Sequence, residues 1–102
     1  MTGLIDTIDH GDIREIRLAR PPVNALNTEL CRALIDAHNT SLDQGVRGIL
    51  LAGNPKIFSA GMDVPYLMSL GDDRKALLDA WQAFFGAART LAESRVPVVA
   101  AI

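Results

Sequence analysis

Ile57-Phe58-Ser59-Ala60-Gly61-Met62-Asp63-Val64 links two regular elements of this chain. An apolar run at residues 48–52 precedes it and predicts a strand, and a predicted short helix follows at residues 65–70. Gly61 can adopt a positive φ that other residues resist, and Asp63 can cap the helix. The pattern predicts a tight turn with unpaired backbone N–H groups over its last four residues, which suits an anion or a developing oxyanion.

Toward the N-terminus, the sequence predicts a hairpin, an extended bend and a helix. Residues 4–10 and 13–18 are two short runs rich in Ile and Leu, separated by Gly11-Asp12. Paired prolines exclude a helix at residues 20–26. Asn27 is a suitable N-cap for an amphipathic helix that ends around residue 42.

Toward the C-terminus, the sequence predicts a long helix and a final strand. After a break and a cap at residues 71–73, apolar positions recur at helical spacing, and we expect them on one side of the helix, as core or subunit contacts. This predicted stripe comprises Leu77, Leu78, Trp81, Phe84, Phe85, Ala88, Leu91 and Ala92. Pro97 ends the helix, and residues 97–102 predict a buried strand parallel to 48–52. The unalternating apolar run at 48–52 predicts a strand covered on both faces.

The composition is that of an ordinary soluble globular protein. Its 102 residues are 49% hydrophobic and 22% charged, with a formal net charge of −2. The ten Lys and Arg residues are scattered, which argues against nucleic acid, and no apolar run reaches membrane-spanning length. His10, His38 and Cys31 have no ligands at metal-binding spacing, and one cysteine with no signal peptide predicts a cytoplasmic protein. The apolar run at 97–102 has no stop signal after it, so we expect the natural chain to continue beyond it.

Three motifs in this chain together resemble the crotonase superfamily, also called the enoyl-CoA hydratase/isomerase family. They are Pro21-Pro22-Val23-Asn24-Ala25-Leu26-Asn27, Lys56-Ile57-Phe58-Ser59-Ala60-Gly61-Met62-Asp63-Val64 and Pro97-Val98-Val99-Ala100-Ala101-Ile102. Their order matches the family over nearly the whole chain. The resemblance implies an α/β fold, a crotonase-like (ClpP/crotonase) spiral of β-β-α units that is incomplete in this chain. It also implies that residues 1–102 are the N-terminal part of a single domain, with no second domain.

The same resemblance implies an acyl-CoA substrate and assigns roles to individual residues. The backbone N–H of Met62 would be one of two oxyanion donors to the thioester carbonyl. Ala25 and Leu26 are expected to line the pantetheine and adenine of coenzyme A, and Ser59 and Ala60 to meet the adenine edge. Lys56 is expected near the phosphates. Asp63 and Val64, at the end of the same motif, are further expected contacts. Coenzyme A would enter as part of the substrate, with no permanently bound cofactor and no metal. The family also implies a homotrimer or a hexamer.

The sequence departs from the family pattern at its end. The second oxyanion donor and the usual catalytic glutamates lie beyond the last strand, so this chain holds half an oxyanion hole and no identifiable general base. Hydratase and isomerase chemistry both stay open. Two alternatives also stay open: a non-catalytic CoA-binding or assembly partner with the same fold, and an unrelated α/β domain that binds a nucleotide phosphate at residues 61–64. For residues 58–64 the structural alternative is a tight strand-to-helix turn of small residues with an Asp cap.

Overall fold

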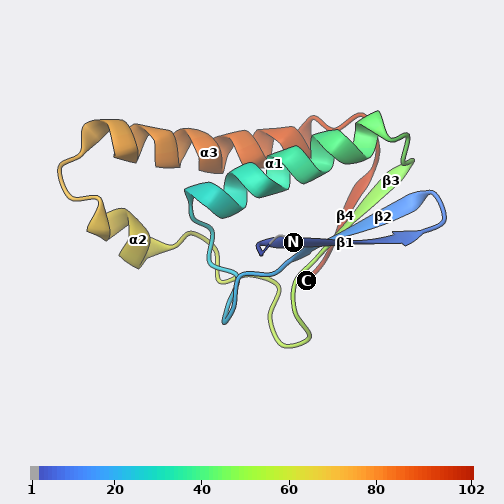
Figure 1. Ribbon diagram of the computed structural model, residues 1–102, viewed down its shortest axis with the longest axis horizontal. Coiled ribbons are helices and arrows are strands. Elements are labelled where there is room, and N and C mark those ends of the chain that lie inside the picture. Colours follow the sequence, from blue (N-terminus) through green and yellow to red (C-terminus); the bar gives the residue numbers. More distant parts are fainter. Residues whose placement is uncertain (1–2) are drawn as a thin grey trace.

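The computed structural model describes residues 3–102, which form a four-stranded sheet with helices on one face (Figure 1). The strands are β1 (Ile5–His10), β2 (Ile13–Leu18), β3 (Gly48–Ala52) and β4 (Val98–Ala101), in the spatial order β1-β2-β3-β4. β1 and β2 are antiparallel, while β3 is parallel to both β2 and β4. The predicted hairpin and the predicted parallel pairing of the last two strands are therefore confirmed.

Three helices follow the predicted pattern closely. They are α1 (Thr28–Asp43), α2 (Val64–Ser69) and α3 (Arg74–Ala92). Each begins after a capping residue, Asn27, Asp63 or Asp73, whose side chain accepts a hydrogen bond from the backbone N–H three residues later. α1 packs on β1 and β2, and α3 packs on α1, so the sheet and these two helices are stacked (Figure 1). All three predicted caps are confirmed.

The side of α3 that is buried differs from the prediction. Ala80, Ala83 and Ala87 are its buried residues, whereas Trp81 is 41% exposed and Phe85 is 60% exposed. Only part of the predicted stripe, including Phe84 and Leu91, packs against the core. The reason is steric, because small side chains let α3 lie close against α1 while its large side chains turn outward.

The sheet is covered on one face only within residues 3–102. Ile49 and Leu51 of β3 point toward the helices and are buried, while Leu50 between them is only half-buried. The prediction that β3 is covered on both faces is therefore wrong for this part of the chain. The prediction of a buried last strand is also wrong here, since β4 lies at the edge of the sheet and Val99 is 61% exposed.

Candidate functional site

Two loops that contain the first two sequence motifs pair with each other as a short parallel ladder. Ala60 N–H donates to the Val23 carbonyl at 2.9 Å, Leu26 N–H donates to the Gly61 carbonyl at 2.7 Å, and Asp63 N–H donates to the Leu26 carbonyl at 2.9 Å. Leu26 and Met62 are the bridging residues. We call residues 23–26 and 60–63 the loop ladder. It brings the two motifs together although α1 and β3 separate them in the sequence.

Asn24 holds the two sides of the loop ladder in place from within. Its side chain is buried, with Oδ1 accepting from Arg20 N–H at 2.8 Å and Nδ2 donating to the Phe58 carbonyl at 3.0 Å. Its φ is 53°, in the left-handed region, which Asn tolerates better than most residues. From the sequence, this position was predicted only to be part of a bend. An Asn two residues after paired prolines was the available signal.

Two glycines near the ladder are required for different reasons. Gly61 has a φ of 88°, as predicted, and a Cβ there would meet no atom within 4 Å, so its requirement is conformational. Gly53, directly after β3, is required for space, because a Cβ there would lie 2.3 Å from the Phe58 carbonyl oxygen. No sequence signal predicts this close approach, because it depends on how the loop folds back.

The predicted group of unpaired N–H donors is smaller than expected. Gly61 N–H donates to Ser59 Oγ at 3.0 Å, and Asp63 N–H is paired in the ladder. Among residues 3–102, neither Met62 N–H nor Val64 N–H has a hydrogen-bond partner. The Met62 N–H belongs to the same trans peptide group as the Gly61 carbonyl, which accepts from Leu26 N–H, so the Met62 N–H points away from Leu26. α2 has only six residues, so a helix dipole adds little at this place.

Asp63 is engaged on both of its carboxylate oxygens. Oδ1 accepts from Tyr66 N–H at 3.0 Å, and Oδ2 accepts from Arg20 Nη1 at 2.8 Å, while the same Nη1 donates to the Ala25 carbonyl at 2.8 Å. The hydrogen bond from Tyr66 N–H, with the Arg20 guanidinium beside it, holds the pKa of Asp63 below its usual value although burial opposes this. Asp63 is therefore ionised and serves as a cap and ion-pair partner.

Two cavities flank the ladder strand 60–63. The outer cavity, of about 400 Å³, is lined by the Pro21-Pro22 bend and by Arg20, Val23, Ala25, Ala60, Met62, Asp63, Val64 and Pro65. The apolar cavity, of about 300 Å³, lies among β2, β3, α1 and α3 and is lined by Leu18, Leu26, Leu34, Leu51, Phe58, Ser59, Gly61, Phe84, Ala87, Ala88 and Leu91. Alternate residues of the segment serve different cavities, with Ser59 and Gly61 on the apolar one and Ala60 and Met62 on the outer one.

The fold brings together all of the predicted site residues except one. Ala25, Ala60, Met62, Asp63 and Val64 line the outer cavity, while Leu26 and Ser59 line the apolar cavity. Lys56 lies on an exposed loop and lines neither cavity, and its backbone N–H donates to Asn54 Oδ1 at 2.8 Å. The cation that does line the outer cavity is Arg20, which was not among the predicted site residues.

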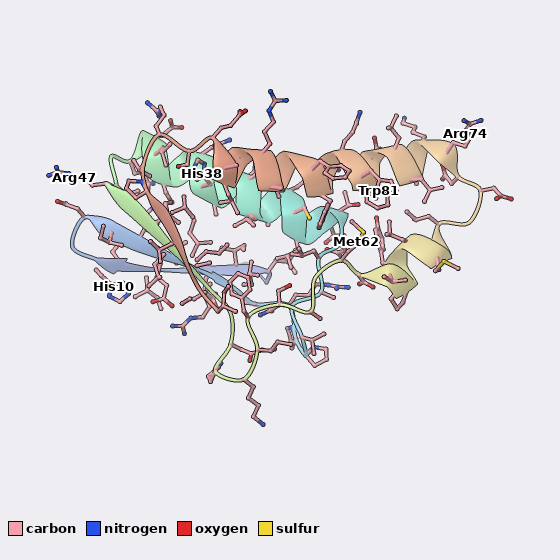
Figure 2. The ribbon with its side chains drawn as sticks, turned by 180° about the vertical axis from the view of Figure 1, so that it is seen from behind. His10, His38, Arg47, Met62, Arg74 and Trp81 are labelled. Atoms are coloured by element: carbon pink, nitrogen blue, oxygen red, sulfur yellow. The ribbon has the colours of Figure 1, made fainter. Side chains whose placement is uncertain are left out.

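The Met62 side chain lies where α1, α2 and α3 meet, at the opposite end of the helix pair from His38 (Figure 2). It shares a small space with Tyr66, Ala80 and Phe84. The backbone of Met62 is therefore anchored on one side by the ladder and its side chain by the helices.

Other candidate groups belong to the packing. Cys31 is buried, and burial raises the pKa of its thiol. His38 is buried with Nε2 2.7 Å from Ser94 Oγ.

Within residues 3–102, no three His, Cys, Asp or Glu side chains are grouped so as to hold a metal ion. None of the helices described is both long and apolar enough to cross a membrane.

Comparison with known proteins decides the family. The model of the family described as enoyl-CoA hydratase/isomerase matches residues 9–102. The chain belongs to the enoyl-CoA hydratase/isomerase family. The resemblance to the crotonase superfamily is thereby confirmed, and the chain corresponds to the N-terminal part of that fold.

Individual family members are similar over most of this chain. A protein of Mycobacterium leprae described as probable enoyl-CoA hydratase echA8 is 38% identical over 90 residues, which cover 85% of this chain and 33% of the relative. A probable enoyl-CoA hydratase of Rhizobium meliloti is 36% identical over 104 residues, covering 99% of this chain and 38% of the relative. The crystal structure of an enoyl-CoA hydratase/isomerase from Mycobacterium paratuberculosis superposes with a TM-score of 0.83 at 31% identity, covering 99% of this chain and 41% of that one. The chain thus spans about a third to two fifths of the length of these relatives.

Proposed function

We propose that the loop ladder binds the thioester of an acyl-CoA substrate and that Met62 N–H is one donor to the thioester oxygen. The observation that carries this proposal is the unpaired Met62 N–H, set between a Gly61 carbonyl and an Asp63 N–H that are both paired with Leu26. A donor fixed in this way needs no reorganisation when negative charge develops on the oxygen. One such donor is worth about 3–4 kcal/mol of barrier in acyl-transfer enzymes.

The outer cavity is the proposed place for the coenzyme A part of the substrate. Ala25 and Ala60 supply small side chains beside main chain there, which suits close approach by an adenine or a pantetheine chain, and Val64 adds apolar surface. Leu26 and Ser59 would meet the ligand through the main chain from the apolar side. Asp63 contributes by holding Arg20 at the cavity, and Lys56 would reach the phosphates only from outside it. Coenzyme A enters with the substrate, and no permanently bound cofactor is proposed.

The proposed reaction is the addition of water across the double bond of an enoyl-CoA, or the shift of that bond, through a thioester enolate. The names of the two relatives, both hydratases, support the first more than the second. Neither reaction is complete with the residues described here. Asp63 is the sole carboxylate that lines either cavity within residues 3–102, and both of its oxygens are engaged, so these residues offer no general base.

A second candidate is a non-catalytic CoA-binding or assembly partner, which would need only the loop ladder and the outer cavity. Both candidates share the binding site and differ in turnover.

For the natural protein we further propose a homotrimer or hexamer in the cytoplasm, which sedimentation and fractionation would test. An exposed apolar face on α3, with Trp81 and Phe85, is available for such an assembly.

The experiment has a catalytic arm and a binding arm. The natural protein is incubated with a 2-enoyl and a 3-enoyl CoA thioester, and turnover of the first indicates a hydratase while turnover of the second indicates an isomerase. In parallel, ¹⁵N-labelled protein is titrated with a saturated acyl-CoA, and we expect the Met62 amide proton to move downfield as it donates to the thioester oxygen.

The outcomes separate the candidates. Binding with a Met62 response but without turnover of either thioester favours the non-catalytic partner. Binding that leaves Met62 unchanged contradicts the proposed oxyanion role. ADP serves as the control ligand, because equal responses to ADP and acyl-CoA would indicate a nucleotide phosphate site instead.

A further inference from the structure

We infer that Ser59 is a positioning residue for the Met62 N–H and acts through a hydrogen-bonded relay that runs from Asn24 to Gly61. The inference rests on the proposed function of Met62 and adds a role for the Ser59 side chain, whereas the expected coenzyme A contact of Ser59 is through its main chain. Ser59 Oγ lies 2.7 Å from the Asn24 carbonyl oxygen and 3.0 Å from the Gly61 nitrogen.

The direction of both hydrogen bonds follows from the groups involved. The Gly61 N–H can only donate, so Ser59 Oγ accepts from it, and the single hydroxyl proton is then donated to the Asn24 carbonyl. The Ser59 hydroxyl donates one hydrogen bond and accepts another, and neither partner is a general base. It is therefore suited to hold the backbone, and not to act as a nucleophile.

The backbone at Gly61 needs such a hold. Two peptide groups meet at its Cα, and the second of them carries the Met62 N–H. Gly61 has a φ of 88° and no side chain, so its backbone can rotate over a wider range than that of other residues. The first peptide group is held by Ser59 Oγ, and the second by the hydrogen bond from Leu26 N–H to the Gly61 carbonyl at 2.7 Å. Together these bonds replace the restraint that a side chain would give.

The other end of the relay is rigid. Asn24 is 1% exposed, and its N–H donates to the Arg20 carbonyl at 2.8 Å while its side chain bonds to both Arg20 and Phe58. The carbonyl that receives the Ser59 hydroxyl is therefore fixed to both loops. Since a displacement of about 1 Å can cost up to about 10²-fold in rate, the direction of the Met62 N–H matters for the enolate.

The first test compares three variants of the natural protein in turnover of an enoyl-CoA. Ser59→Ala removes the relay, Ser59→Thr keeps the hydroxyl, and Ser69→Ala is the matched control, since the exposed Ser69 hydroxyl only donates to the Tyr66 carbonyl on α2. We expect Ser59→Ala to lower kcat by about tenfold with KM changed by less than about twofold, because the donor serves the transition state more than the ground state. Ser59→Thr should recover most of kcat, and Ser69→Ala should keep it. A Ser59→Ala enzyme with the kcat of the wild type overturns the inference.

The second test needs no turnover and no ligand. Amide hydrogen exchange is measured by NMR on the same variants, and in Ser59→Ala we expect Gly61 to exchange at least about tenfold faster, since its acceptor is lost. The Met62 amide should shift in position while the Leu26 amide is unchanged. Unchanged Gly61 and Met62 amides contradict the relay whatever the protein binds. A loosened Gly61 in Ser59→Ala, together with a wild type that neither binds nor turns over acyl-CoA, leaves the relay in place and overturns the proposed function instead.

Discussion

The loop ladder and α3 differ in how their sequences relate to their structures. The ladder has no long regular element, yet its backbone is held by specific partners on Asn24, Ser59 and Asp63. α3 has the most strongly patterned sequence in the chain, but its alanines are buried and several of its largest apolar side chains are exposed. A periodic pattern therefore predicts a helix but not which of its sides is buried, whereas a few small or polar residues can define a site.

The largest effect is expected at Gly53, beside the ladder. Gly53→Ala would place a Cβ 2.3 Å from the Phe58 carbonyl oxygen, and backbone atoms would have to move. We expect a loss of about 3 kcal/mol or more in the free energy of unfolding, measured by urea denaturation. Gly61→Ala is the matched variant, because it has a strained φ but no clash, and we expect it to lose about 1 kcal/mol in the free energy of unfolding. Equal losses would show that space is not what Gly53 provides.

A somewhat smaller effect is expected at Asn24. Asn24→Ala would leave the Arg20 N–H and the Phe58 carbonyl without their partner and place Ala at a φ of 53°. We expect a loss of about 2–3 kcal/mol by denaturant unfolding. Gln82→Ala, at an exposed position of α3, should change stability by less than about 0.5 kcal/mol. If Asn24→Ala lowered the free energy of unfolding as little as Gln82→Ala, the loop ladder would not depend on Asn24.

On α3, the two faces should respond unequally to substitution. Ala83→Leu adds volume to the packed face against α1 and should cost about 1–3 kcal/mol. Phe85→Ala removes a larger side chain but from a site that is 60% exposed, so we expect a loss of less than about 1 kcal/mol in the isolated chain. Thermal unfolding of the two variants measures both losses of stability. A larger loss for Phe85→Ala would mean that the exposed face is covered in solution, as a subunit contact would require.

The smallest effect concerns the charge of Asp63 and depends on pH. The pKa of Asp63 is lowered in the folded state, chiefly by the hydrogen bond from Tyr66 N–H and then by Arg20. A lowered folded pKa gives stability that is complete above the unfolded pKa and is lost as the pH falls through the folded pKa. The stability advantage of the wild type over Asp63→Asn should therefore be constant from about pH 7 to about pH 5 and shrink below about pH 4.

The control for this titration is Gln82→Ala, which removes no titratable group from an exposed position of α3. Its difference from the wild type in the free energy of unfolding should stay small across the same range. A constant difference for Asp63→Asn down to about pH 3 would contradict the role of the ion pair with Arg20.

Much of the fold was predictable because it depends on neighbours in the sequence. Asn27, Asp63 and Asp73 each cap a helix through the N–H three residues later, and the Gly11-Asp12 turn joins adjacent strands. Such interactions need no distant partner. The family, too, could be inferred from three motifs in order, and the match over residues 9–102 confirmed it.

The remaining features depend on partners that are far apart along the chain. By itself the sequence determined where helices and strands begin, which residues cap them, that Gly61 would turn and to which family the chain belongs. Only the tertiary structure decided that Leu26 pairs with Gly61 and Asp63, that Met62 N–H stays unpaired, that Arg20 lines the outer cavity while Lys56 does not, and that alanines form the buried face of α3. The physical reason is distance along the chain, because a hydrogen bond or a packed face between remote segments exists only after the sheet and helices have placed both sides.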